Sequence, residues 1–244
     1  MAKITTLLFD CDNTLVLSES LAFEACADLA NEILESQGIP DRYTGPALLA
    51  DFVGQNFRGM MRSLQEKYKF TLPDDEFEGY VTREEDKVIE KINAALKSCD
   101  GVEPVLESLA VSGTYLLAVV SSSAKRRVQA SVDKVGMDRY FPSERIFSAA
   151  TSLPKPTSKP DPAIYLYACE TLERPAPECV AIEDSKNGTL SAVRAGIATI
   201  GYVGSYEPHE RDEMRKVLAD AGANPIMESW EEFEAALKEI EARE

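Results

Sequence analysis

Short apolar runs alternate with amphipathic segments along most of the chain. The first run, Ile4–Phe9, combines apolar and β-branched residues and ends just before Asp10. Its length and flanks predict a buried strand. Later strands are predicted by four similar runs, Tyr115–Val120, Arg145–Phe147, Cys179–Ile182 and Ala198–Ile200, of which Arg145–Phe147 has the weakest pattern.

Helical periodicity fills the intervals between these strands. Val102, Val105, Leu106 and Leu109 recur on one helix face and are followed by Gly113. The same reasoning predicts helices over Ala124–Val135, Ala163–Leu172, Asn187–Ala195 and Ser229–Glu244. The last of these is expected to bury Trp230, Phe233, Ala236, Leu237 and Ile240. Alternating strands and helices predict an α/β fold with a parallel sheet, in which ligands bind beyond the carboxyl ends of the strands.

The stretch from residue 16 to residue 98 breaks this alternation, because it contains no convincing strand. Its apolar positions instead predict a series of amphipathic helices over Ser20–Gln37, Pro46–Val53, Asn56–Tyr68 and Asp74–Leu96. Gly38, Gly54 and Pro73 punctuate the series. An all-helical insert directly after the first strand predicts a separate small domain over residues 16–98, with a core domain formed by residues 1–15 and 99–244. One continuous α/β domain with long decorations is the alternative.

Composition limits the classes of partner. With 44% hydrophobic and 28% charged residues, the 244-residue chain is typical of a globular protein with a sizeable core. Its formal net charge of -16 argues against nucleic acid, whose phosphates attract a basic surface. The same negative field repels anionic substrates, so a site for phosphate needs its own local cation.

Cysteine usage and hydropathy bear on location. The five cysteines have no CxxC or zinc-finger spacing, which predicts reduced thiols in the cytoplasm. The apolar run near residue 1 is too short for a signal peptide, and no segment approaches transmembrane length. We therefore expect a soluble cytoplasmic protein with no membrane partner.

Two carboxylates follow the first strand. On an extended segment, Asp10 and Asp12 point to the same side. Crowded carboxylates repel each other and favour a cation, and hard oxygen ligands suit Mg²⁺. With the charge offset, one aspartate can act as a nucleophile on phosphorus. Two aspartates separated by one residue at a strand end do not by themselves establish such a site, because receiver domains and loop caps carry the same pattern.

Other polar residues also fall at strand ends or helix starts. Ser121 closes the second strand, where a hydroxyl and free helix amides favour an anion, or simply cap the helix. Lys159 precedes the helix over residues 163–172 and would supply the missing cation, unless it is a solvated loop lysine. Glu183 and Asp184 end a later strand and would complete an oxygen cage, or cap the next helix. No single ordinary explanation accounts for all of them.

Four motifs, in this order, resemble those of the haloacid dehalogenase superfamily of phosphohydrolases: FDCDNTL, VVSSS, SKPDPAIY and AIEDSKNGTLSAVRAG. They are most similar to the sugar-phosphate phosphatase and β-phosphoglucomutase-like subfamily. The resemblance implies a Rossmann-like core with helices on both faces of its sheet. It also implies a helical cap inserted after the first strand. Because such a cap has to move, we expect a monomer.

The resemblance also implies roles for the acidic residues. Asp10 would be the nucleophile and a metal ligand. Asp12 would be the general acid and base, with its main-chain carbonyl on Mg²⁺. Asp184 would ligate the metal, and Glu183 would do so directly or through water. We therefore expect the carboxylates of residues 10, 12 and 184 to converge on one ion, with the amine of Lys159 beside them.

Further roles follow for the phosphate site and the turn after the first strand. Ser121, Ser122 and Lys159 would bind the transferring phosphoryl group. Lys155 also precedes a proline, but a helix starts directly behind Lys159, which favours the latter. Asn13 stands where the family usually has glycine, and asparagine tolerates the positive φ that the turn requires.

The reaction can be narrowed further. A dehalogenase has no use for the proton donor Asp12. A β-phosphoglucomutase uses a histidine of its first cap helix, whereas the corresponding Glu19–Phe23 has none. A phosphatase acting on a small phosphorylated metabolite is favoured, and a sugar, sugar-acid or polyol phosphate would suit it. A sugar-phosphate mutase and a catalytically silent binding module remain the alternatives.

The cap is expected to select the substrate. In Gly54-Gln55-Asn56-Phe57-Arg58-Gly59, which connects two predicted cap helices, Arg58 is the candidate for contacting the leaving group. Gln55 and Asn56 could hydrogen-bond substrate hydroxyls, which would suit a polyol or sugar phosphate. A surface arginine on a helix is an equally ordinary explanation for Arg58.

Overall fold

The computed structural model describes residues 3–52 and 55–243. It divides into two compact units, formed by Met1–Leu17 with Lys97–Glu244 and by Ser18–Leu96, which we call the core domain and the helical unit. Within the core domain the two linking segments pair, since Val16 bridges to Ser98. The division falls at residues 17/18 and 96/97, whereas the sequence pattern favours 15/16 and 98/99.

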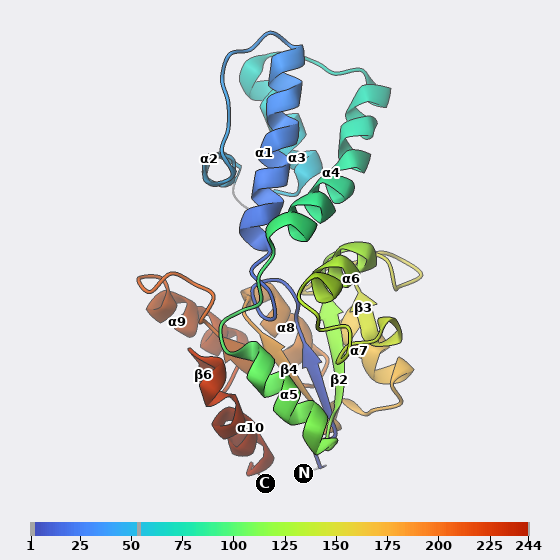
Figure 1. The fold of residues 1–244 in the computed structure, drawn as a ribbon, viewed down its shortest axis with the longest axis vertical. Coiled ribbons are helices and arrows are strands. Elements are labelled where there is room, and N and C mark those ends of the chain that lie inside the picture. Colours follow the sequence, from blue (N-terminus) through green and yellow to red (C-terminus); the bar gives the residue numbers. More distant parts are fainter. Residues whose placement is uncertain (1–2, 53–54, 244) are drawn as a thin grey trace. The chain divides into compact units, whose positions relative to one another are not determined.

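The core domain is built on one parallel sheet of strand order β3-β2-β1-β4-β5-β6 (Figure 1). This is the order of a Rossmann-like, doubly wound sheet, in which β1 and β4 flank the point where the order reverses. The strands are β1 Thr6–Phe9, β2 Leu116–Ser121, β3 Ile146–Ser148, β4 Cys179–Glu183, β5 Ala198–Tyr202 and β6 Ile226–Met227. All five predicted strands are present, and the predicted parallel α/β fold is confirmed.

Helices cover both faces of this sheet. On one face, α7 and α8 pack against small and branched strand residues such as Leu8, Ala118 and Ala181. On the other, the Phe9 ring stacks on Trp230 and Phe233 at the start of α10. The helices are α5 Val102–Ser112, α6 Lys125–Lys134, α7 Ala163–Thr171, α8 Lys186–Arg194, α9 Arg211–Ala221 and α10 Phe233–Glu241.

The last predicted helix begins later than its pattern indicates. Residues Trp230–Glu232 form a 3₁₀ turn capped by the Ser229 side chain, and α10 starts at Phe233. The five apolar residues assigned to its buried face are all buried. α9 and β6 were not predicted, because charged residues dominate α9 and β6 is only two residues long.

The helical unit has its own core. It contains α1 Glu19–Ser36, α2 Gly45–Asp51, α3 Phe57–Tyr68 and α4 Asp74–Ala95, in agreement with the four predicted helices. Leu29, Ile33, Leu48 and Leu64 are fully buried within it. The predicted end of the second helix at Val53, and the break at Gly54, lie outside the described residues.

Two further expectations concern the chain as a whole. All five cysteines are buried free thiols, as their spacing indicates. Among residues 3–52 and 55–243, no helix is both long enough and apolar enough to cross a membrane.

Candidate active site

Three neighbouring strands bring the predicted site residues together. Asp10 follows β1, Ser121 ends β2, and Glu183 ends β4 with Asp184 directly after it. Since β2, β1 and β4 are adjacent and parallel, their carboxyl ends meet at one edge of the sheet. The main-chain amide of Asp10 also donates to Ile182, which extends the β1–β4 pairing to the site.

Lys159 is buried at the centre of this edge. Its Nζ donates to Asp10 Oδ1 at 2.6 Å, to Glu183 Oε1 at 2.6 Å and to the Val120 carbonyl at 2.8 Å. Its main-chain amide donates to Ser122 Oγ at 3.2 Å, which anchors the loop that carries it. An ammonium group has three N–H donors, so all three are engaged.

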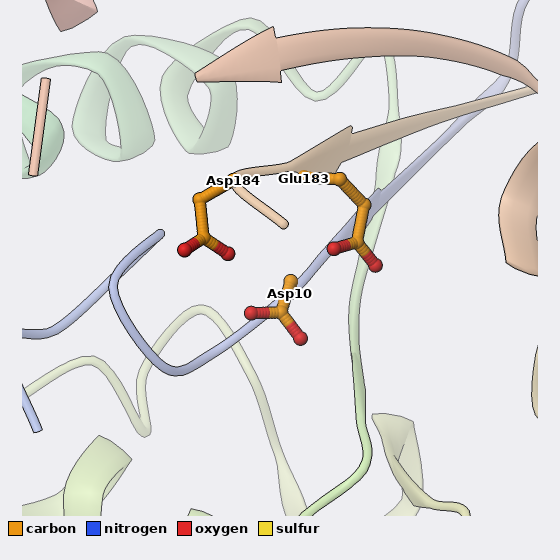
Figure 2. Close-up of side chains that lie close together, drawn as sticks. All are labelled: Asp10, Glu183 and Asp184. Carbon is orange, nitrogen blue, oxygen red and sulfur yellow. The ribbon is translucent and has the colours of Figure 1, made fainter. Parts of the chain in front are cut away.

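Asp10, Glu183 and Asp184 form a buried acidic group. One carboxylate oxygen from each lies within 4.8 Å of the others, and Figure 2 shows the three side chains side by side beyond β1 and β4. Thr14 Oγ1 donates to Asp184 Oδ1 at 3.2 Å. The three carboxylates outnumber the single ammonium that pairs with Asp10 and Glu183, and carboxylate oxygens are the ligands that Mg²⁺ prefers.

Glu183 is fully buried, and its two oxygens differ. Oε1 accepts from Lys159 Nζ and, at 2.5 Å, from the hydroxyl of Tyr165. Oε2 has no hydrogen-bond partner. It lies against Gly188 of α8, where a Cβ would fall 1.7 Å from it. An orphaned buried carboxylate oxygen within an acidic group fits a bound cation.

Burial governs the electrostatics of the site. Desolvation, followed by the charges of Glu183 and Asp12, raises the pKa of Asp10 to about 7, although Lys159 opposes the shift. Burial lowers the pKa of Lys159, but the carboxylates of Asp10 and Glu183 outweigh it and raise that pKa above its ordinary value. Burial, then Glu183, raises the pKa of Tyr165 well above its usual range. Lys159 therefore stays charged and Tyr165 stays a neutral donor.

The carboxylate of Asp12 is near enough to Asp10 to raise its pKa, and it has hydrogen-bond partners of its own. It accepts from Ser123 Oγ at 2.7 Å and from Arg127 Nη2 of α6 at 3.1 Å. Convergence of the Asp12 carboxylate on the same ion as Asp10 and Asp184 stays a prediction.

Small polar residues shape the turn at Asn13 and the loop that follows β2. Asn13 has a φ of 58°, which confirms the predicted left-handed position. Ser121 Oγ accepts from the amide of Ser123 at 3.0 Å, and Ser122 Oγ holds the loop of Lys159. These bonds shape the loop after β2, and phosphate binding by Ser121 and Ser122 stays a prediction.

The two predicted cap residues lie in the helical unit. Arg58 donates through both terminal nitrogens to the carboxylate of Glu78, with Nη2–Oε2 at 2.6 Å, and its guanidinium lies over the Phe77 ring. Gln55 Oε1 accepts from Ser63 Oγ at 2.9 Å. Their contact with substrate stays a prediction.

Sequence reasoning missed Tyr165, Arg127 and Ser123. Tyr165 stands in the same SKPDPAIY segment as Lys159, but its apolar surroundings favour a core residue. Arg127 belongs to the basic run at the start of α6, whose partner Asp12 lies 115 residues away. Only the fold brings these side chains to the site.

Comparison with known proteins identifies the family. A family model described as haloacid dehalogenase-like hydrolase matches residues 4–196, and the chain belongs to this family. The predicted resemblance and the expectation of a hydrolase are thereby confirmed.

Two relatives span nearly the whole chain. A 6-phosphogluconate phosphatase of Escherichia coli (strain K12) is 27% identical over 236 residues, which cover 94% of this chain and 96% of that protein. A phosphorylated carbohydrates phosphatase of Thermotoga maritima is 31% identical over 234 residues, with 96% and 98% covered. The fold also matches a family IA, variant 3 hydrolase of Entamoeba histolytica, with a TM-score of 0.76 at 21% identity and 97% and 99% of the two chains covered.

Proposed function

We propose that this chain is a magnesium-dependent phosphatase that hydrolyses a small phosphorylated metabolite through an aspartyl phosphate on Asp10. The observation that carries the proposal is the buried carboxylate of Asp10, bonded to Lys159 beside Glu183 and Asp184 at the carboxyl ends of β1 and β4. The phosphatase names of the two long relatives support it.

The acidic group is suited to the metal. Asp10 and Asp184 would hold Mg²⁺ together with the main-chain carbonyl of Asp12, and Glu183 would contribute directly or through water. When bound, Mg²⁺ would offset the mutual repulsion of the carboxylates and the charge of the phosphoryl oxygens. The unpartnered Oε2 of Glu183 supports this assignment.

The chain's own residues account for the two chemical steps. A carboxylate oxygen of Asp10 attacks phosphorus, and the bond from phosphorus to the ester oxygen breaks while Asp12 protonates that oxygen. Asp12 then takes a proton from a water molecule that attacks the same phosphorus, which releases inorganic phosphate and restores Asp10. Lys159, together with Ser121 and Ser122, would hold the phosphoryl oxygens. Positioning and charge neutralisation supply most of the acceleration in such transfers.

A sugar, sugar-acid or polyol phosphate is the substrate class that we favour. The names of the two long relatives support phosphorylated carbohydrates. Gln55 and Arg58 of the helical unit would contact the part of the substrate beyond the phosphate. The enzyme would act as a monomer in the cytoplasm.

The test is phosphate release from para-nitrophenyl phosphate, with Mg²⁺ and with EDTA, by the wild-type chain and by Asp10→Asn. We expect turnover that depends on the metal and falls at least about a thousandfold in the variant. A panel of phosphorylated metabolites then identifies the substrate. No release from any phosphoester would contradict the proposal, and isomerisation of a sugar phosphate without release would identify a mutase.

A further inference from the structure

All three donors of the Lys159 ammonium are engaged within the protein. They bind Asp10 Oδ1, Glu183 Oε1 and the carbonyl of Val120, and the Lys159 side chain is only 4% exposed. The present inference rests on the proposed function, in which Lys159 binds the phosphoryl group. A phosphoryl oxygen can accept a hydrogen bond from Lys159 only if one of these three acceptors loses its own.

The three acceptors differ in how readily each can lose its hydrogen bond from Lys159. The carbonyl of Val120 belongs to β2 and is fixed by the sheet. Asp10 is the nucleophile, which Lys159 has to keep close to phosphorus. Glu183 Oε1 also accepts from the hydroxyl of Tyr165 at 2.5 Å, so it keeps a donor if Lys159 leaves. Glu183 is therefore the acceptor whose release costs least.

We propose that Tyr165 is a positioning residue that keeps Glu183 hydrogen-bonded while Lys159 turns one of its protons from Glu183 to a phosphoryl oxygen. No covalent bond changes in this exchange. The proton that faces Glu183 stays on Lys159 and only changes its acceptor.

The surroundings of Glu183 explain why the phenol matters. The carboxylate is fully buried, and its Oε2 has no hydrogen-bond partner. Without the Tyr165 hydroxyl, the departure of Lys159 would leave this buried charge with no donor on Oε1 either. Tyr165 itself is buried and its ring lies 5.3 Å from Lys159 Nζ, so it is held in place throughout the exchange.

Tyr165→Phe removes the hydroxyl and keeps the ring. Because Lys159 holds the phosphoryl group before and during reaction, the loss should appear in binding rather than in turnover. We expect the KM for para-nitrophenyl phosphate and the dissociation constant of inorganic phosphate to rise about tenfold to a hundredfold, the range for a lost hydrogen bond to a charge. The value of kcat should change by less than about threefold.

Tyr167→Phe is the matched control, since Tyr167 lies on the same helix and packs its ring edge-on against Phe147. It should leave both binding constants unchanged. If Tyr165→Phe lowers only the thermal midpoint, and phosphate binds as in the wild type, the hydroxyl is merely structural and the inference is wrong. If the wild type neither binds phosphate nor hydrolyses phosphoesters, the proposed function itself fails.

A structure of the wild-type chain with Mg²⁺ and inorganic phosphate gives a test that needs no variant. We expect Lys159 Nζ to contact phosphate and to lie beyond hydrogen-bond distance of Glu183 Oε1, while the Tyr165 hydroxyl stays on that oxygen. Retention of the bond to Glu183, with Asp10 or Val120 released instead, would overturn the inference.

Discussion

The ion pairs at the candidate site of the core domain are buried, whereas an ion pair of the candidate substrate residue in the helical unit is exposed. Lys159 forms ion pairs with Asp10 and Glu183, and the three side chains are only 4%, 11% and 0% exposed. In the helical unit, Arg58 and Glu78 form an ion pair with side chains 39% and 55% exposed. A buried ion network loses much free energy when one member is removed, whereas an exposed pair contributes little. The buried ion pairs of the core domain can therefore keep the site residues in a fixed geometry. The exposed Arg58–Glu78 pair of the helical unit can be broken at a low cost in free energy, which would let Arg58 bind another group.

Lys159→Met should produce the largest effect, because it leaves two buried carboxylates without their cation. At pH 8 in EDTA we expect the free energy of unfolding to fall by about 3–5 kcal/mol, measured by denaturant titration. Turnover should fall at least about a hundredfold, since the phosphoryl group loses its cation.

Lys155→Met is the control for this change. Lys155 lies in the same loop and is exposed, so its loss should alter neither stability nor turnover. If Lys159→Met and Lys155→Met lowered stability and turnover equally, the burial of Lys159 would not explain its importance.

The pH dependence of stability should be the next largest effect. The folded-state pKa of Asp10 is raised from 3.8 to about 7, so folding favours the protonated carboxyl. Its contribution to stability is complete below the unfolded-state pKa and is lost as the pH rises towards 7, by up to about 1.4 kcal/mol per pH unit. In EDTA, the stability of Asp10→Asn relative to the wild type should therefore increase between about pH 4 and pH 7.

Thermal unfolding across this pH range provides the measurement. Above about pH 7 the difference between variant and wild type should level off, because Asp10 is then ionised in both folded and unfolded chains. A difference independent of pH would show that the Asp10 carboxyl is not perturbed by burial.

Gly188→Ala should have an intermediate effect. Its Cβ would lie 1.7 Å from Glu183 Oε2, so α8 or the buried carboxylate has to shift. We expect a loss of about 1–3 kcal/mol of stability and weaker binding of Mg²⁺ by calorimetry. Gly79→Ala in α4 is the matched control, since its added Cβ would meet no atom within 4 Å beyond the adjacent residues and the nearby backbone of its own helix. That substitution should raise stability by about 0.5–1 kcal/mol, and destabilisation by both would contradict this account.

Arg58→Ala should have the smallest effect on stability, because its ion pair is exposed. If Arg58 contacts the leaving group, the KM for the best sugar phosphate should rise several-fold, with a smaller fall in kcat. Arg83→Ala, which removes another exposed pair of the same unit, should leave the kinetics unchanged. Unaltered kinetics of Arg58→Ala with every active substrate would remove Arg58 from the site.

Local pattern predicted most of the fold. Apolar runs marked β1 to β5, and glycines marked several helix ends, because strand burial and helix termination are properties of neighbouring residues. At the site, Asp10, Lys159, Glu183 and Asp184 could be proposed because parallel strands end at one edge of the sheet.

The rest depended on contacts between distant segments. The hydroxyl of Tyr165 meets Glu183 across 18 residues of sequence, and Arg127 meets Asp12 across 115. The periodicity of apolar residues along a helix or strand carries no information about pairs between distant segments. The partners of Asp12 were likewise not foreseen, because Ser123 and Arg127 reach it from the segment after β2.

The central claim is that Asp10 carries the phosphoryl group during turnover. Its most direct test is acid quench during steady-state hydrolysis, followed by reduction with borohydride, which converts an acyl phosphate of aspartate to homoserine. Peptide mass spectrometry should then locate homoserine at position 10, only when a phosphoester substrate was present. Rapid turnover with an unmodified Asp10, or with modification at another carboxylate, would contradict the account.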